Sequence, residues 1–210
     1  MEPKVEETKS QIINTSVQLF LKNGIKRVTM DDIAREMGIS KKTIYQHFRD
    51  KEEIIITATQ MYMEKECEIM ENLRKNANNA VEHLFNLSRL LRETFNNMHV
   101  AVLQDLKRYY KNAWSIYQKF EREVFYKEIE TSLKTGIKEG FFRKEINIKI
   151  LSTLRLIEIQ MSFDNEVFDH NSHSLFDIQH QLLEHFTYGI LSEKGIELYN
   201  SYKKQLIHEK

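Results

Sequence analysis

The chain has 210 residues, of which 30% are charged and 41% hydrophobic, with six Gly and one Pro. This composition is typical of a soluble protein dominated by helices. No apolar run approaches the roughly 18 residues that a membrane-spanning helix requires, and Met1-Glu2-Pro3-Lys4 does not resemble a signal peptide. We therefore expect a cytoplasmic protein with no membrane partner. A single cysteine, Cys67, excludes an internal disulfide.

The 31 basic and 31 acidic residues give a formal net charge of zero, but they are unevenly distributed. Residues 22–51 contain eight Lys or Arg and four Asp or Glu, so this segment carries +4 and the remainder −4. A basic segment attracts the phosphate backbone of nucleic acids, whereas an acidic body is repelled by it. The pattern favours a nucleic-acid interface within residues 22–51.

Within this basic segment the sequence predicts two short helices separated by a tight turn. Thr29 followed by Asp32 has the spacing of a capping box, so the first helix should begin at Thr29 and end at Gly38. Ser40 can cap the second helix. The apolar residues recur at spacings that bring them together in one small core, namely Ile33, Met37, Ile39, Ile44 and Phe48. This is the layout of a DNA-binding helix-turn-helix.

Longer helices should flank the pair. Apolar residues recur at helical spacing from Ile12 to Phe20, and Gly24 follows as a stop signal. Asp50 followed by Glu53 repeats the capping signature, so another helix should start at residue 51. A three-helix unit results, with a fourth helix leading away from it.

Beyond residue 52 we find no strand-like alternation long enough to predict a sheet. Apolar residues at three- and four-residue steps predict helices over 51 to the low seventies, 81–98, 100–110, 114–133, 146–161, 175–190 and from 195 to near the C-terminus. A polar connection is expected over 164–174. The predicted fold class is therefore all-α, with a helix-turn-helix DNA-binding domain at residues 1–51 and a helical ligand-binding and dimerisation domain at residues 52–210.

Residues 12–53 resemble the N-terminal domain of the TetR family of bacterial transcriptional regulators. The family's Ala-x-x-Leu-Phe-x-x-x-Gly, Thr-x-x-x-Ile-Ala and Gly-Val-Ser-x-x-Thr-Leu-Tyr-x-His-Phe-x-x-Lys-Glu elements correspond to residues 16–24, 29–34 and 38–52. Two positions depart from the pattern: Ser16 replaces the usual Ala, and Lys42 occupies a position often held by Gly. The second departure affects how closely the recognition helix approaches the groove.

The resemblance implies a ligand-responsive regulator, more often a repressor than an activator, that binds an inverted-repeat operator in double-stranded DNA as a homodimer. It implies neither catalysis nor a cofactor. The resemblance implies phosphate contacts for Thr29, Lys41, Tyr45, His47 and Lys51. It implies contacts with base edges for Lys42, Thr43 and Gln46, and Ser40 lies at the start of the same surface.

The helix predicted at 146–162 carries an apolar stripe, and the helix predicted at 174–191 carries an apolar arc wider than one packing face requires. The resemblance implies that they form a four-helix dimer seam, with two helices from each subunit. The interface residues predicted on this basis are Ile150, Leu154, Ile157, Leu175, Ile178, Leu182, Phe186 and Gly189. The alternative is that the second helix is buried between neighbours of its own chain.

Aromatic residues are concentrated in the middle of the C-terminal region. Tyr and Trp bury large areas but carry a polar group that needs a partner, which suits a pocket for a small aromatic or lipophilic ligand. The predicted lining residues are Phe85, Phe95, Tyr109, Tyr110, Trp114, Tyr117 and Phe120. A solid aromatic core is the alternative.

A histidine-rich segment, residues 164–185, mixes imidazoles with carboxylates and has the donor types of a divalent-metal site. No established ligand spacing is present, so we predict no metal site there. Two further interpretations stay open. One is a DNA-binding protein of the same fold without small-molecule input, and the other is a helical metalloenzyme with this segment as its site.

Overall fold

The computed structural model describes residues 3–96 and 98–208, and the chain forms two compact units. Unit 1 comprises Met1–Glu66 and Asn97–Phe120, and unit 2 comprises Cys67–Asn96 and Glu121–Lys210. The units therefore interleave in sequence, and one long helix, α4 (Lys51–Asn76), contributes residues to both.

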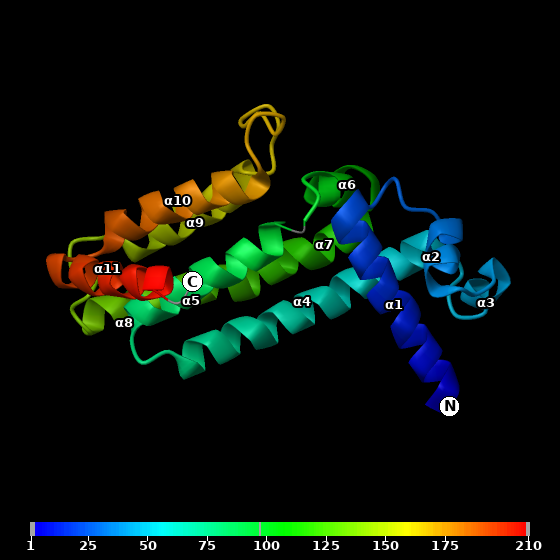
Figure 1. Cartoon of the computed structure of the whole chain (residues 1–210), viewed down its shortest axis with the longest axis horizontal. Coiled ribbons are helices and arrows are strands. Elements are labelled where there is room, and N and C mark those ends of the chain that lie inside the picture. Colours follow the sequence, from blue (N-terminus) through cyan, green and yellow to red (C-terminus); the bar gives the residue numbers. More distant parts are fainter. Residues whose placement is uncertain (1–2, 97, 209–210) are drawn as a thin grey trace. The chain divides into compact units, whose positions relative to one another are not determined.

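Helices make up the regular structure of the described residues, as the all-α prediction requires (Figure 1). Besides the first part of α4, unit 1 contains α1 (Pro3–Asn23), α2 (Met30–Met37), α3 (Lys41–Tyr45), α6 (Ala101–Tyr109) and α7 (Lys111–Phe120). Unit 2 contains the end of α4, α5 (Ala80–Asn96), the π-helical segment η1 (Glu121–Phe125), α8 (Tyr126–Lys138), α9 (Ile148–Met161), α10 (Leu175–Ile190) and α11 (Glu193–His208). No strand occurs in residues 3–96 or 98–208, where one isolated antiparallel bridge joins Phe142 and Leu191.

The predicted caps of the two short helices of unit 1 are present. Thr29 and Asp32 form the capping box at the start of α2, and Gly38 ends this helix in the left-handed conformation, with φ of 66°. Ser40 caps α3 by accepting a hydrogen bond from the backbone N–H of Thr43 at 3.1 Å. Each cap satisfies backbone groups that would otherwise lack partners at a helix end.

The start of α4 is fixed in a similar way. Oδ1 of Asp50 accepts a hydrogen bond from the backbone N–H of Glu53 at 2.9 Å, and Oε2 of Glu53 accepts one from the backbone N–H of Arg49 at 2.7 Å. The helix begins at residue 51 as predicted, and it ends at Asn76, a few residues beyond the predicted end in the low seventies.

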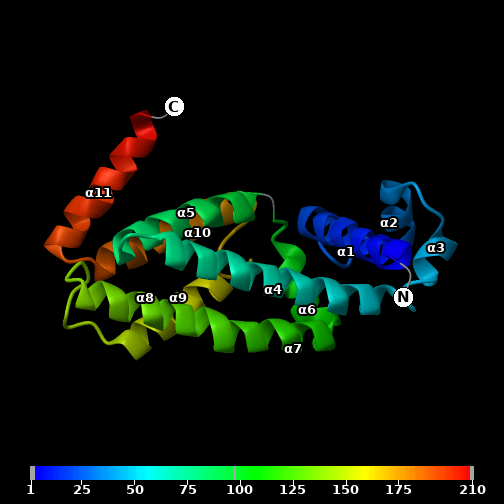
Figure 2. The ribbon, with the colours of Figure 1, turned by 90° about the horizontal axis from the view of Figure 1, so that it is seen from below.

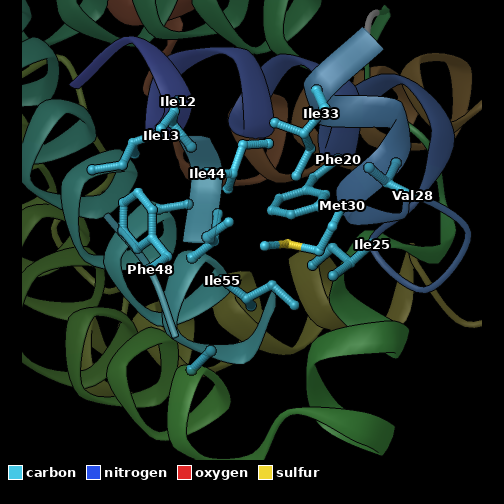
Figure 3. Packing of buried hydrophobic residues seen from close by; sticks show 14 of the residues in the cluster. Ile12, Ile13, Phe20, Ile25, Val28, Met30, Ile33, Ile44, Phe48 and Ile55 are labelled. Atoms are coloured by element: carbon cyan, nitrogen blue, oxygen red, sulfur yellow. The ribbon is translucent and has the colours of Figure 1, made fainter. Parts of the chain in front are cut away.

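A hydrophobic core holds the helices of unit 1 together (Figure 3). Ile33, Ile44 and Phe48 are almost completely buried in it, and Met37 and Ile39 pack at its edge. Its buried members from α1, the following turn, α2 and α4 are Ile12, Ile13, Phe20, Ile25, Val28, Met30, Ala34, Ile54, Ile55 and Ala58, and α6 and α7 add Val102, Leu106 and Ala113. The two short helices are thus held by side chains that lie far apart in the sequence.

In unit 2, α5 packs against α8, α10 and α11, and α9 packs against α8 and α10 (Figure 2). The buried cluster that these helices share is Ala80, Val81, Leu84, Phe85, Leu133, Phe142, Phe186, Ile190, Leu191 and Tyr199. The polar segment between α9 and α10 forms a connection without a helix, as predicted.

The helix predicted over 114–133 is continuous but not uniform. A π-helical segment separates α7 from α8, and its first residue, Glu121, is buried and accepts a hydrogen bond from Nε2 of Gln160 at 2.7 Å. A π segment widens the helical turn and changes which faces the flanking helices present. Periodicity alone does not reveal it, because the partner of Glu121 lies on α9.

Candidate nucleic-acid interface and apolar cavity

The polar side of α3 faces solvent because Ile44, on the opposite side of this helix, is completely buried. The residues expected to contact DNA fall into two groups by exposure. Those that are exposed are Thr29, Ser40, Lys41, Lys42, Tyr45 and Gln46, and those that are half-buried are Thr43, His47 and Lys51. Tyr45 is 49% exposed, which is unusual for a large aromatic side chain. The surface is therefore built of side chains that are available to a partner, and their contacts with DNA stay a prediction.

One cation of this surface already has a partner within the chain. Nζ of Lys41 donates a hydrogen bond to Oδ2 of Asp31 on α2 at 2.9 Å, and this carboxylate raises the pKa of Lys41. Both side chains are exposed, so the pair is screened by water and contributes little to stability. A DNA phosphate would compete with Asp31 for the ammonium group.

Lys51 lies differently from the other predicted contact residues. Its Nζ donates to the backbone carbonyls of Ile25 at 2.6 Å and of Lys26 at 3.3 Å. Burial lowers the pKa of Lys51, although nearby Asp105 acts in the opposite direction. Two of the three N–H bonds of this ammonium thus hold the turn before α2, which leaves one for a phosphate.

The same turn receives a second support that sequence reasoning missed. Asp105 on α6 is buried, and its Oδ2 accepts a hydrogen bond from the backbone N–H of Lys26 at 2.8 Å. The Lys26 side chain extends to Tyr109, with Nζ 3.1 Å from the phenol oxygen and 4.5 Å from the ring centroid. No local pattern could indicate these contacts, because they join positions about eighty residues apart.

The predicted dimer residues divide into two groups. On α9, Ile150, Leu154 and Ile157 are 63%, 42% and 49% exposed and form one row along the helix. On α10, Gly189 is exposed and Leu182 is half-buried. Leu175, Ile178 and Phe186 are instead buried within their own chain, being 3%, 5% and 6% exposed. For these three residues the expectation is corrected, because α5 and α9 already cover that side of α10.

The predicted aromatic pocket residues do not form one group. Phe85 and Phe95 belong to unit 2, whereas Tyr109, Tyr110, Trp114, Tyr117 and Phe120 belong to unit 1. They pack in separate pairs: Phe85 stacks on Tyr202, Phe95 meets Phe163 edge-on, and Trp114 stacks on Tyr117 with ring centroids 5.1 Å apart. Tyr109 is 43% exposed. Aromatic residues that are clustered in the sequence thus pack in separate contacts between helices.

Unit 2 contains a cavity of about 50 Å³ that none of these seven aromatic residues lines. It lies among the end of α4 and the helices α5, η1, α8, α9 and α10, and its apolar lining residues are Met70, Leu84, Leu87, Leu91, Phe125, Ile129, Leu133, Ile159, Leu183, Phe186 and Ile190. The predicted lining is therefore corrected for this cavity: aliphatic residues dominate its walls.

Four polar residues also line the cavity, namely His83, Glu128, Ser132 and Arg155. Glu128 and Ser132 are one helical turn apart on α8, between the apolar residues Phe125, Ile129 and Leu133. Polar residues four positions apart on an otherwise core-facing helix side are the sequence signal that would have indicated this wall.

Neither a metal site nor a membrane-spanning segment is found in the part of the chain that the structure describes. Over these residues, the histidine-rich segment 164–185 included, no three His, Cys, Asp or Glu side chains come close enough together to hold an ion. No described helix is both long enough and apolar enough to cross a bilayer.

Residues 12–58 match the sequence profile of the bacterial regulatory proteins of the tetR family. The HTH-type transcriptional regulator YerO of Bacillus subtilis (strain 168) is 38% identical over 71 residues, which cover 34% of this chain and 25% of YerO. The match to this curated relative therefore spans a quarter of its length.

Solved structures extend the likeness to nearly the whole chain. A TetR-family transcriptional regulator from Agrobacterium tumefaciens superposes with a TM-score of 0.75 at 12% identity, over 90% of this chain and all of the other. A transcriptional regulator from Saccharomonospora viridis, solved in complex with choline, gives a TM-score of 0.69 at 21% identity over the same shares. At these identities the likeness concerns the fold.

The helix-turn-helix motif, the family profile and the fold agree with one another. Residues 12–58 carry the N-terminal helix-turn-helix domain of the tetR family of bacterial regulatory proteins, and the chain has the fold of a solved TetR-family regulator.

Proposed function

We propose that the protein is a transcriptional regulator, most readily a repressor, that binds an inverted-repeat operator as a homodimer and releases it when a small ligand binds in unit 2. The observation that carries the proposal is the solvent-facing polar side of α3, held in place by the buried Ile44. A rigid helix that displays Lys, Thr, Tyr and Gln side chains suits the major groove of duplex DNA.

Phosphate and base contacts are assigned by side-chain chemistry. Lys41, Tyr45 and His47 supply cations or polar hydrogens for phosphate oxygens, which fix the position of the helix on the duplex. Lys42 suits the acceptors of guanine and Gln46 suits adenine. Lys42 and Gln46 are both exposed, so neither has to leave a buried position to reach a base.

A dimer is supported by the apolar row on α9. Ile150, Leu154 and Ile157 would lose contact with water if a second copy covered them, and exposed Gly189 on α10 allows close approach of another backbone. A two-fold dimer of helix-turn-helix domains reads two half-sites about one helical turn of DNA apart, or a longer in-phase distance, which is why the operator should be an inverted repeat.

Ligand response is supported by the cavity in unit 2 and by a transcriptional regulator of the same fold that was solved in complex with choline. A ligand changes operator affinity only as far as it binds one conformation more tightly than the other. Binding in unit 2 therefore has to favour the conformation with the weaker hold on DNA.

The test starts from random duplex DNA, from which the purified protein selects its operator. Gln46→Ala should relax preference at one base position at a cost of about 1–3 kcal/mol, whereas Tyr45→Ala should weaken binding to every sequence alike. Gln60→Ala, at an exposed glutamine on α4 whose amide donates to Glu64 of the same helix, is the matched control and should leave binding unchanged. Specific binding that survives the combined Lys41, Tyr45 and Gln46 alanine variant would contradict the assignment.

A further inference from the structure

The cavity in unit 2 is small and almost wholly hydrocarbon-lined (its helices are labelled in Figure 2). Its volume of about 50 Å³ leaves room for a few water-sized groups. An occupant therefore has only a few non-hydrogen atoms, and most of them must be apolar to match the aliphatic walls.

One wall of the cavity contains two buried oxygen atoms that form no hydrogen bond within the described residues, although one of them belongs to an ion pair. Oε1 of Glu128 and Oγ of Ser132 are both buried and accept or donate no hydrogen bond there. The hydrogen bond from Nε of Arg74 goes to the other carboxylate oxygen, Oε2, at 3.3 Å. Burying a polar atom without a hydrogen-bond partner costs free energy. A ligand that donates hydrogen bonds to these two oxygens removes this cost, and its binding is strengthened accordingly.

The charge of the preferred ligand follows from how the two buried ionic groups of the cavity are paired. Arg155 is held by groups that are themselves buried: its guanidinium lies 3.2 Å from Oε2 of Glu158 and 3.5 Å from Oε1 of Gln179. Neither partner can be released to water without unfolding the surrounding helices. Arg155 is therefore committed to its own network and is a poor site for an anion.

Glu128 is paired in a way that allows exchange. Its ionic partner, Arg74 near the end of α4, lies 3.1 Å from Oε1 but is 40% exposed, so the guanidinium can return to solvent when another cation takes its place. His83 Nε2 lies 3.8 Å from the same oxygen, yet burial lowers the pKa of His83 to about 4, so this imidazole is neutral at pH 7 and does not compensate the carboxylate.

We propose that Glu128 and Ser132 bind the protonated amino group of a small aliphatic amine, whose hydrocarbon part fills the apolar remainder of the cavity. The ammonium group donates to Oε1 of Glu128 and to Oγ of Ser132 and replaces Arg74 as the counter-ion. The regulatory meaning of this exchange rests on the proposed function. Arg74 belongs to α4, whose first part lies in the helix-turn-helix unit, so ligand binding removes one contact that holds the end of α4 in unit 2.

The experiment measures binding without DNA, so its outcome is separate from that of the operator test. The full-length protein, with labelled isoleucine methyl groups, is titrated with butylamine, 1-butanol and butyrate, which share a chain length and differ in the polar group. Methyl signals of Ile129 and Ile159 report on the cavity wall, and Ile33 in the core of unit 1 serves as the internal control. We expect shifts at the isoleucines that line the cavity, Ile129, Ile159 and Ile190, and none at Ile33, with a dissociation constant for butylamine about tenfold below those of the alcohol and the acid.

Three variants test the residues. Glu128→Gln should remove the preference for the amine. The control is Glu130→Gln, which removes the same charge from the same helix. Because Glu130 pairs with Lys134, this variant should retain the preference. Arg74→Gln should strengthen amine binding, because it removes the competing cation from an exposed position where the fold does not depend on it. A merely structural role for Glu128 would leave the Arg74 variant with unchanged affinity.

Several results would overturn the proposal. Tightest binding of butyrate would assign the site to Arg155 and an anion instead. Amine preference that survives in Glu128→Gln, or methyl shifts of equal size at Ile33 and Ile129, would show that the amine does not bind at this wall. Absence of any shift with all three probes would show that the cavity is not a ligand site for this class.

Discussion

The backbone N–H of Lys26 and the carboxylate of Asp105 are joined by a hydrogen bond of 2.8 Å across 79 positions of the chain. This bond attaches α6 to the turn that precedes α2. Gly24, in the same turn, has φ of 82°, and a Cβ added there would lie 3.4 Å from Oδ2 of Asp105. The turn is therefore shaped by α6 as well as by its own glycine.

Asp105→Ala should destabilise unit 1 and weaken operator binding. The substitution leaves the N–H of Lys26 without its partner in a partly buried place, and loss of a hydrogen bond to a charged group costs about 1–3 kcal/mol. Urea unfolding of the variant measures the loss. Lys107→Ala, on the exposed side of α6, is the control and should change stability by less than about 0.5 kcal/mol. Equal stability of the two variants would show that the Lys26 contact is dispensable.

Lys51→Met should affect both folding and DNA binding. Its ammonium loses two hydrogen bonds to the carbonyls of Ile25 and Lys26, so we expect a loss of about 1–3 kcal/mol in the free energy of unfolding. If the third N–H reaches a phosphate, the slope of log K against log salt also falls by about 0.9.

Lys42→Met provides the contrast for this prediction, because Lys42 is exposed and has no such bonds to the turn. It should leave stability unchanged and alter base preference. An unaltered free energy of unfolding for Lys51→Met would show that the hydrogen bonds from Lys51 to the turn do not contribute to stability. An unaltered slope of log K against log salt would show that Lys51 does not contact a phosphate.

Leu154→Glu on α9 should convert the dimer into monomers. Leu154 is 42% exposed in the single chain, so the charge is tolerated by the monomer, but it would be buried without a partner at the proposed seam. Sedimentation velocity at micromolar concentration measures the change. Thr131→Glu, an exposed position on α8, should leave the dimer intact. A wild-type protein that sediments as a monomer would contradict the proposed interface.

His83 should make stability depend on pH in the acidic range. Burial, together with the charge of Arg74, lowers its pKa from the ordinary 6.5 to about 4, so the unfolded chain binds more protons than the folded one between these values. The contribution of His83 to the free energy of unfolding is therefore fully present above about pH 6.5 and is lost as the pH falls toward 4. The full loss is at most about 3 kcal/mol.

Urea unfolding at pH 7 and pH 4.5 of wild type and His83→Gln isolates this contribution. Wild type should lose more stability than the variant between the two pH values. Glu128 faces His83 and acts in the opposite direction: burial raises its pKa, so its protonation favours the folded state as the pH falls, but this contribution is present in both proteins. Equal losses would show that His83 titrates normally.

The caps of α2, α3 and α4 could be predicted from sequence because their interactions are local. Thr29 and Asp32, or Ser40 and Thr43, are three residues apart, so a hydrogen bond between them depends on little beyond the chain itself. The all-α fold and the helix-turn-helix surface followed from the same short-range rules and from the resemblance of residues 12–53.

The faces of α10 could not be assigned in this way. Periodicity shows that a helix side is apolar, but the apolar side of a core helix and that of a dimer helix have the same pattern. Only the packing of α5 and α9 decided that Leu175, Ile178 and Phe186 are covered by their own chain, whereas Ile150 on α9 is not.

The sequence by itself thus determined the helical character of the chain, the caps of α2, α3 and α4 and the polar surface of α3, since these depend on residues within one or two helical turns of each other. Tertiary structure alone decided where the cavity lies and what faces it. Arg74, His83 and Glu128 come from three different helices, and their proximity arises from the packing of unit 2. The link between Lys26 and Asp105 has the same origin, because a hydrogen bond over 79 positions leaves no trace in local spacing.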